Sequence, residues 1–178
     1  LRDLSLHGTA VTDSGLVQLA GMKLNRLSLP DHLMTDVGLK HYLKASNPKR
    51  RLNLGRWSIT DQGLAHVKGL TMLDELDLYP GWKITDEGMV VLKEMTSLKD
   101  LALPSQVTDA GLIHVKEMSH LQKLVLPSRI TDSGLIHIKE MTRLRALILP
   151  SQITDTGLIH VQEMPHLQTL FLGREITD

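Results

Sequence analysis

Leucines recur along this chain in the pattern Leu-x-x-Leu-x-Leu, once in every period of roughly 23 to 25 residues. Copies begin at residues 1, 24, 73, 98, 121, 144 and 167. A degenerate copy has Lys49 in the first leucine place, ahead of Leu52 and Leu54. Alternate residues share one face of a β-strand, so Leu4 and Leu6 point the same way. The pattern predicts a short strand with one buried face at the start of each period.

A second motif, Thr-Asp-x-Gly-Leu, follows each predicted strand. It begins at residues 12, 35, 60, 108, 131 and 154, a copy ending in Met begins at residue 85, and an eighth is cut off at 177–178. Beyond the motif the period changes, because Leu112, Val115 and Met118 fall at i, i+3 and i+6. Thr and Asp are good N-caps, and an acidic first turn suits the helix dipole. We therefore expect a helix to begin at each copy.

The glycine of this motif recurs in every complete copy, although glycine costs about 1 kcal/mol inside a helix. We expect a steric demand there, namely close backbone approach between neighbouring repeats. One unit cannot bury its leucine face alone, so the units must stack into a single core. The chain opens inside a repeat, which favours a fragment of a longer protein. The single domain 1–178 divides into repeats 1–23, 24–48, 49–72, 73–97, 98–120, 121–143, 144–166 and a partial repeat 167–178.

These spacings resemble the leucine-rich repeat family. The Thr-Asp-x-Gly-Leu element is similar to a short bacterial subclass that is related to the cysteine-containing repeats of F-box proteins. The resemblance covers the whole chain. It implies an α/β fold, a right-handed solenoid with a parallel sheet on the concave face and helices on the convex face. It also implies that the concave strand face is the usual partner site.

In such a sheet, equivalent residues form rows about 4.8 Å apart, and the third, fifth and seventh positions of each strand motif should point outward. The third row places opposite charges side by side: Asp3, Arg26, Arg51, Glu75, Asp100, Lys123, Ala146 and Thr169. The fifth row changes from polar to apolar: Ser5, Ser28, Asn53, Asp77, Ala102, Val125, Ile148 and Phe171. The seventh row should end the strands, because proline lacks an amide hydrogen: His7, Pro30, Gly55, Tyr79, Pro104, Pro127, Pro150 and Gly173.

The apolar half of the fifth row is one candidate interaction site. Ala102, Val125, Ile148 and Phe171 form a stripe on the predicted outer face, and exposed apolar patches mark binding surfaces. One alternative is that β-branched residues simply suit strands. Another is that downstream sequence covers the stripe.

Repeats two to four supply the second candidate site, since they hold most of the aromatic residues: Tyr42, Trp57, Tyr79 and Trp82. Trp57 and Trp82 occupy similar places in consecutive repeats, so we expect them to be neighbours on one edge. Basic residues (Lys49, Arg50, Arg51, Arg56) abut acidic ones (Asp74, Glu75, Asp77). Aromatic and Arg side chains are enriched at binding hot spots. The alternatives are that the Trp rings fill space made by the insertions and that the charges neutralise each other.

Composition argues against chemistry in this segment. Lys plus Arg equals Asp plus Glu at 20 each, the short basic cluster has acidic neighbours, and we expect no nucleic-acid partner. No apolar run approaches the roughly 18 residues of a membrane span. Five of the nine histidines recur on one predicted helical face, which we interpret as solvated surface: His41, His66, His114, His137 and His160. No catalytic, metal or phosphate-loop motif is present, so we expect no enzyme activity and no cofactor.

The sequence therefore favours a protein-interaction scaffold that binds a protein partner on its concave face. The proposed partner-binding residues are Arg51, Trp57, Glu75, Asp77, Tyr79, Trp82, Ala102, Val125, Ile148 and Phe171. One alternative is a substrate-recognition segment of a larger enzyme or signalling protein. Another is a structural solenoid that self-associates end to end through uncapped termini. The absence of Cys fits a cytoplasmic protein.

Overall fold

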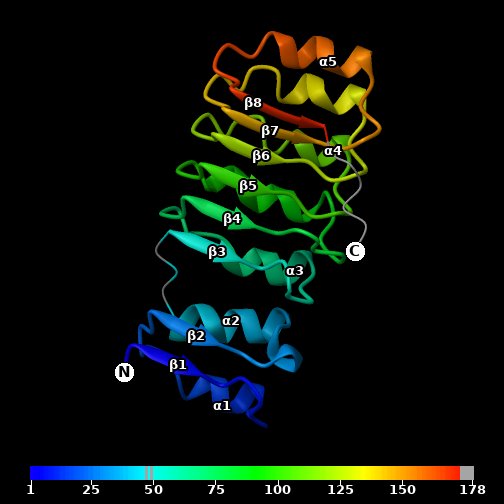
Figure 1. Ribbon diagram of the computed structural model, residues 1–178. Coiled ribbons are helices and arrows are strands. Elements are labelled where there is room, and N and C mark those ends of the chain that lie inside the picture. Colours follow the sequence, from blue (N-terminus) through cyan, green and yellow to red (C-terminus); the bar gives the residue numbers. More distant parts are fainter. Residues whose placement is uncertain (47, 49, 173–178) are drawn as a thin grey trace.

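The computed structural model of this chain describes residues 1–46, 48 and 50–172, and it shows a mixed α/β fold built on parallel strands. A two-stranded sheet has the order β1-β2 and a six-stranded sheet has the order β3-β4-β5-β6-β7-β8. The strands lie one above another in chain order (Figure 1). Their bounds are β1 Asp3–Ser5, β2 Arg26–Ser28, β3 Arg51–Asn53, β4 Glu75–Asp77, β5 Asp100–Ala102, β6 Lys123–Val125, β7 Ala146–Leu149 and β8 Thr169–Leu172.

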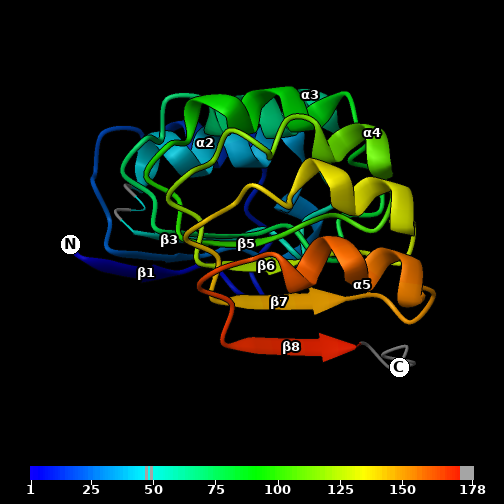
Figure 2. The same cartoon turned by 90° about the horizontal axis from the view of Figure 1, so that it is seen from above.

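The helices cover one face of the sheets and leave the other face without a helical layer (Figure 2). The α-helices are α1 Asp13–Val17, α2 Asp36–Ala45, α3 Asp61–Leu64, α4 Asp109–Leu112 and α5 Asp155–Gln162. The 3-10 helices are η1 Asp31–Leu33, η2 Ala65–Val67, η3 Gly88–Glu94 and η4 Asp132–His137. The predicted helix starts are confirmed in six motif copies. In four of them the Thr side chain accepts an N–H at the N-cap: Thr35, Thr60, Thr108 and Thr154.

The helical segments are shorter than the apolar stripes that predict them. Leu112, Val115 and Met118 are all buried, as the stripe requires, yet α4 ends at Leu112. The apolar spacing is strictly three residues, which matches the 3.0 residues per turn of a 3-10 helix better than the 3.6 of an α-helix. This spacing explains why turns and 3-10 segments replace much of the expected α-helix.

The core consists of two clusters of aliphatic side chains between the sheets and the helices. A small cluster in the first two repeats contains Leu16, Leu24, Leu27, Leu29, Leu33 and Ala45. A large cluster extends from Leu39 to Met164 through all later repeats. Tyr42 and Trp57 pack against both clusters, with their rings 5.4 Å apart in an edge-to-face arrangement. These two aromatic residues therefore join the two parts of the core.

In five motif copies, from the second to the sixth, the Asp carboxylate joins its motif to the next one along the chain. Asp109, for example, accepts the Thr131 backbone N–H at 2.8 Å and the Thr131 hydroxyl at 2.6 Å. A methyl group on Gly134 would overlap the Asp109 side chain, so only glycine fits at that point. The expected close approach is therefore made by a side chain and not by the backbone. This carboxylate link occurs in the pairs Asp36–Thr60, Asp61–Thr85, Asp86–Thr108, Asp109–Thr131 and Asp132–Thr154.

Hydrogen bonding within the link stabilises the ionised carboxylate. The two hydrogen bonds that Thr154 donates hold the pKa of Asp132 below its usual value. The Asp of each motif was expected to stabilise its own helix by interacting with the helix dipole. In the structure its oxygens are used mainly by the following repeat.

The stack is interrupted between the second and third repeats. No strand pairing joins β2 to β3 among the residues that the structure describes (Figure 1). Besides the Tyr42–Trp57 contact, the connection there includes the Asp36–Thr60 link, a backbone hydrogen bond from the Ser58 N–H to the Met34 carbonyl at 2.8 Å, and an exposed ion pair between Arg56 and Asp31 at 3.1 Å. Lys49, the departure from the leucine pattern, lies outside the described residues, as do Gly173 and the truncated motif at 177–178. None of the described helices has the length and apolar character needed to span a membrane.

Candidate functional site

The face of the six-stranded sheet that the helices leave uncovered carries the third and fifth rows, as predicted. All members of these two rows are exposed or half-buried, whereas the leucines between them are buried, such as Leu76, Leu101, Leu124 and Leu147. The strands pair in register, so Ala102 lies beside Val125 and Val125 beside Ile148. The apolar stripe of the fifth row is therefore continuous across β5, β6 and β7.

The prolines of the seventh row end the strands, as predicted. Strands β5 and β6 stop two residues before Pro104 and Pro127, and β7 stops directly before Pro150. These prolines and Pro30 are buried, yet Pro127 and Pro150 contribute to the lining of a pocket on the uncovered face. The Pro127 carbonyl accepts the Ile130 N–H, and its counterparts do likewise, so the chain turns directly after each strand.

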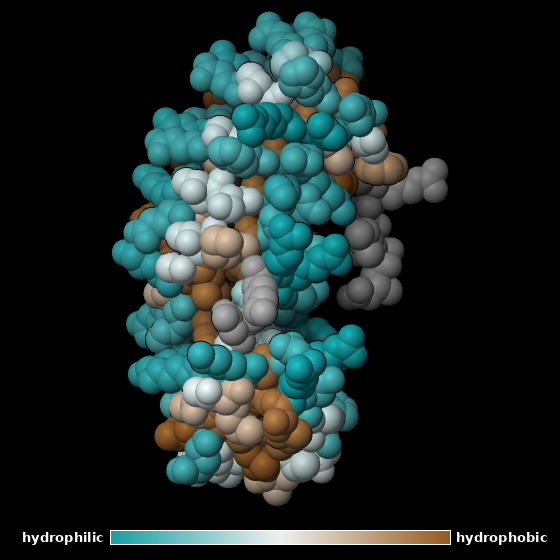
Figure 3. Space-filling view, turned by 90° about the vertical axis from the view of Figure 1, so that its left-hand side faces the viewer, coloured by the Kyte–Doolittle hydropathy of each residue, from teal (hydrophilic) through white to brown (hydrophobic). Residues whose placement is uncertain are grey.

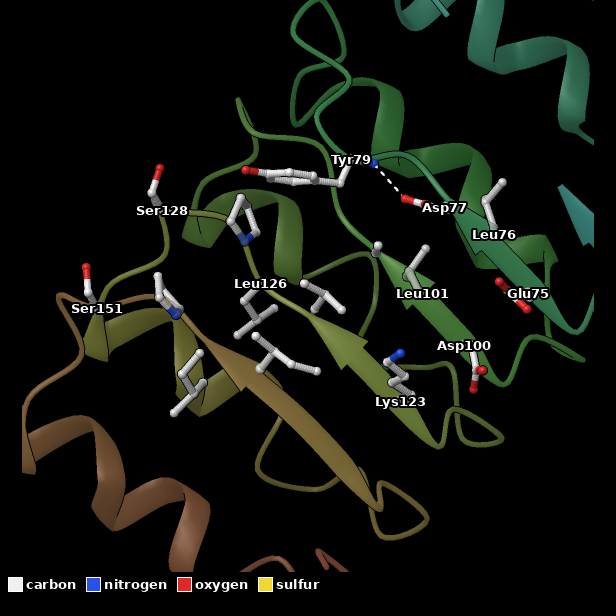
Figure 4. Close-up of a pocket in the computed structure, with 16 residues that line it drawn as sticks. Glu75, Leu76, Asp77, Tyr79, Asp100, Leu101, Lys123, Leu126, Ser128 and Ser151 are labelled. Carbon is white, nitrogen blue, oxygen red and sulfur yellow. Dashed lines mark hydrogen bonds between the residues drawn. The ribbon is translucent and has the colours of Figure 1, made fainter. Parts of the chain in front are cut away.

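A pocket of about 540 Å³, which we call the sheet pocket, lies on the uncovered face over β4 to β7 (Figure 4). Its floor is the stripe of Ala102, Val125 and Ile148. Tyr79, which follows β4, projects over one side with 39% of its surface exposed. Acidic side chains from β4 and β5 also line the pocket: Glu75, Asp77 and Asp100. The pocket thus has an apolar half and a negatively charged half.

The three carboxylates of the sheet pocket differ in their partners. Glu75 pairs with Arg51 at 3.1 Å. Asp77 accepts the side-chain N–H of Asn53 at 2.7 Å and the backbone N–H of Tyr79 at 3.1 Å, so it is held by neutral donors. Asp100 lies beside Lys123 in register, yet within the described chain no cation comes within 4.0 Å of it. Asp77 and Asp100 therefore face the pocket without a cationic partner.

The remaining basic and acidic residues of repeats three and four largely neutralise each other, which was one of the two alternatives. Asp74 binds Lys99 at 2.9 Å and Arg50 at 2.8 Å. The hydrogen bond from Lys99, with the positive charges of Arg50 and Lys99, holds the pKa of Asp74 below its usual value. These residues form a charge network outside the sheet pocket.

Six of the ten predicted partner-binding residues line the sheet pocket: Glu75, Asp77, Tyr79, Ala102, Val125 and Ile148. Arg51 is not a lining residue, but it forms an ion pair with Glu75, which is one. Phe171 lies on β8 beside Ile148 with 59% of its surface exposed. The pocket therefore unites the acidic part of one predicted site with the apolar part of the other.

Trp57 and Trp82 do not share an environment, although their sequence positions are similar. Trp57 is half-buried and packs on both core clusters, as expected if it fills space created by the insertions. Trp82 is 66% exposed. The ring contact of Trp57 is with Tyr42, and the expectation that Trp57 and Trp82 are neighbours on one edge stays a prediction.

Four polar lining residues of the sheet pocket were not among the predicted site residues: Asp100, Lys123, Ser128 and Ser151. Asp100 and Lys123 belong to the third row and were interpreted only as a charge pair. The two serines each follow a proline, in a Pro-Ser pair that also occurs at 104–105. Both serines lie in the turn after a strand, where the alternation of strand residues no longer indicates which side a residue takes.

The recurring histidines are less exposed than expected. Only His66 is fully exposed, while His41, His114, His137 and His160 are half-buried. The Nδ1 atom of His114 is buried with no hydrogen-bond partner. In the described part of the chain, no three His, Asp or Glu residues are grouped so that they could hold a metal ion.

The sequence matches no protein-family model. It also matches none of the curated proteins. The function must therefore be inferred from the sheet pocket and its surroundings.

Proposed function

We propose that this chain is a leucine-rich-repeat solenoid that binds a protein partner on its uncovered sheet face, which would be the concave inner surface. The repeating motifs, the in-register parallel strands and the single helical layer support this assignment. The function is binding, with no catalytic step in the segment and no cofactor.

The observation that carries this proposal is the sheet pocket. It combines an apolar floor with charged and hydroxyl groups around it, as protein interfaces combine an apolar centre with a polar rim. Tyr79 stands at its edge, and tyrosine is one of the residues most enriched among binding hot spots. The floor belongs to strands that pair on both sides, so it is held rigidly before a partner arrives.

The test compares the same substitution at two isoleucines, the half-buried Ile148 and the exposed Ile136. Ile148→Asp places a charge on the pocket floor, whereas Ile136→Asp places the same charge on the helical side, where Ile136 is 47% exposed. Proteins that the wild-type chain captures from the source cell are quantified for both variants. We expect Ile136→Asp to retain the partner and Ile148→Asp to lose most of it, with unchanged circular dichroism. Equal capture by both variants contradicts a role for this face.

Two other functions share parts of this evidence. In a larger enzyme or signalling protein, the same face would select a substrate protein. End-to-end self-association is supported by Leu170, Phe171 and Leu172 on β8, and by apolar surface at the lower end in Figure 3, where the first repeats lie. Sedimentation velocity of wild type and Phe171→Asp separates this case. A concentration-dependent oligomer that Phe171→Asp dissolves favours self-association.

A further inference from the structure

The sheet pocket has two chemically different halves at a fixed separation. Its acidic half is formed by β4 and β5, and its apolar half by β6 and β7. Neighbouring strands lie about 4.8 Å apart, so the centres of the two halves are on the order of 10 Å apart. An extended peptide places residues i and i+2 on the same side, about 7 Å apart, and a long side chain covers the remaining distance. One short extended segment can therefore occupy both halves.

The acidic half is suited to a cationic side chain. Asp77 is held in place by Asn53 and by the Tyr79 backbone, and neither donor neutralises its charge. Asp100 has no ion-pair partner among the described residues. Arg51 offsets the charge of Glu75. The carboxylates of Asp77 and Asp100 are then balanced by one cationic group in the lining, the ammonium of Lys123. The lining keeps an excess of negative charge that a partner can complement.

Tyr79 adds a second feature that favours a cation. In Figure 4 its backbone N–H faces the Asp77 carboxylate, and its ring extends away from that carboxylate over the pocket. A Lys or Arg head group that approaches an aromatic face gains a cation–π attraction of about 0.5–1 kcal/mol at an exposed site.

We propose that the sheet pocket binds an extended segment of a protein partner in which a Lys or Arg lies within two residues of an aliphatic or aromatic residue. The basic side chain occupies the acidic half between Asp77 and Asp100. The apolar side chain lies on the floor over Val125 and Ile148. This inference rests on the proposed function, because it specifies the partner chemistry of the same face.

The experiment selects random 12-residue peptides displayed on phage against the whole chain. Synthetic copies of the enriched peptides are then measured by fluorescence anisotropy. Three variants are compared with wild type. Asp100→Asn removes a charge that has no ion-pair partner, Ile148→Asp alters the floor, and Glu117→Gln removes an exposed charge outside the pocket. We expect enriched peptides with the proposed pair, about tenfold weaker binding to Asp100→Asn, and unchanged binding to Glu117→Gln.

Each other outcome overturns the inference in a distinguishable way. Peptides that lack a basic residue, or that bind Asp100→Asn as tightly as wild type, disprove the cationic partner. If those peptides still lose binding to Ile148→Asp, the proposed function of the face stands. Peptides that bind Ile148→Asp normally contradict the proposed function as well. Failure to enrich any peptide disproves recognition of an extended segment, while a folded partner on this face would still satisfy the proposed function.

Discussion

The first two repeats and the five that follow carry the same sequence motifs, yet they are joined in different ways. Between the first and second repeats the strands pair, but the Asp13 Oδ1 atom is buried with no hydrogen-bond partner. Between the second and third, the Asp36–Thr60 link forms without strand pairing. From the third repeat to the seventh, both connections are present at every junction.

This difference separates the structural role of the motif from the function of the chain. In the copies that form the carboxylate link, Asp and Thr hold one repeat to the next and Gly leaves room for the carboxylate, all on the helical side. The sheet pocket spans β4 to β7, where the strands and the carboxylate links are both continuous. A binding surface is best placed on elements whose geometry is fixed beforehand. The doubly connected region supplies that rigidity, and the first two repeats do not.

The largest loss of unfolding free energy is expected at the joint between the two regions, where the second repeat meets the third. Trp57→Ala removes the ring that packs on both core clusters, and we expect a loss of about 3 kcal/mol in the free energy of unfolding. Urea denaturation followed by circular dichroism should then show an early transition of the first two repeats. Trp82→Ala is the control, because its exposed ring should cost no more than about 0.5 kcal/mol. Equal losses in both variants contradict a joint at Trp57.

A smaller effect is expected from paired glycine substitutions in the two regions. In Gly134→Ala the added methyl group collides with the Asp109 side chain, so we expect a loss of about 2 kcal/mol in unfolding free energy. At Gly15 the nearest obstacle is only the Val11 side chain. Alanine also favours a helix by about 1 kcal/mol over glycine, so Gly15→Ala should be close to neutral. Chemical denaturation of both variants measures the difference in unfolding free energy. Equal values would show that the carboxylate link does not require the space that Gly134 leaves beside Asp109.

The smallest change in unfolding free energy is expected from replacing a motif Asp, and it should differ between the two regions. Asp109→Ala leaves the Thr131 N–H and hydroxyl without their acceptor, which should cost about 1.5 kcal/mol of unfolding free energy. Asp13→Ala removes a buried oxygen that has no partner, and it should leave stability unchanged or raise it. Thermal melts of the two variants at neutral pH make the comparison. A similar loss for both residues would show that Asp13 also has a partner.

Much of the sheet could be predicted from the sequence because its signals are local and repeated. The alternation of buried and outward residues along each strand identifies the buried leucines. Equivalent places in the Leu-x-x-Leu-x-Leu motif indicate which residues of neighbouring strands lie side by side, such as Ala102 and Val125. The helix starts were predictable for the same reason. The Thr and Asp of each motif carry N-cap chemistry in their own sequence neighbourhood.

The carboxylate link could not be found in this way, because its two partners come from different repeats. Asp109 and Thr131 are 22 residues apart, and no local periodicity connects them. The constant Thr-Asp-x-Gly spacing was the available signal, and it was interpreted as serving each helix separately. The sheet pocket was predicted only in part, since the turn that begins at Pro127 brings Ser128 into its lining. That turn depends on contacts in three dimensions.

The central claim is that the uncovered sheet face, and not the helical face, meets the partner. A photo-crosslinking amino acid is placed at Val125 on the pocket floor and, in a second version, at Ile136 on the helical side. Each version is irradiated in the source cell, and the crosslinked proteins are separated by size and identified by mass spectrometry. The account predicts a discrete adduct from Val125 that Ile136 does not give. A discrete adduct from Ile136 with none from Val125 would contradict it.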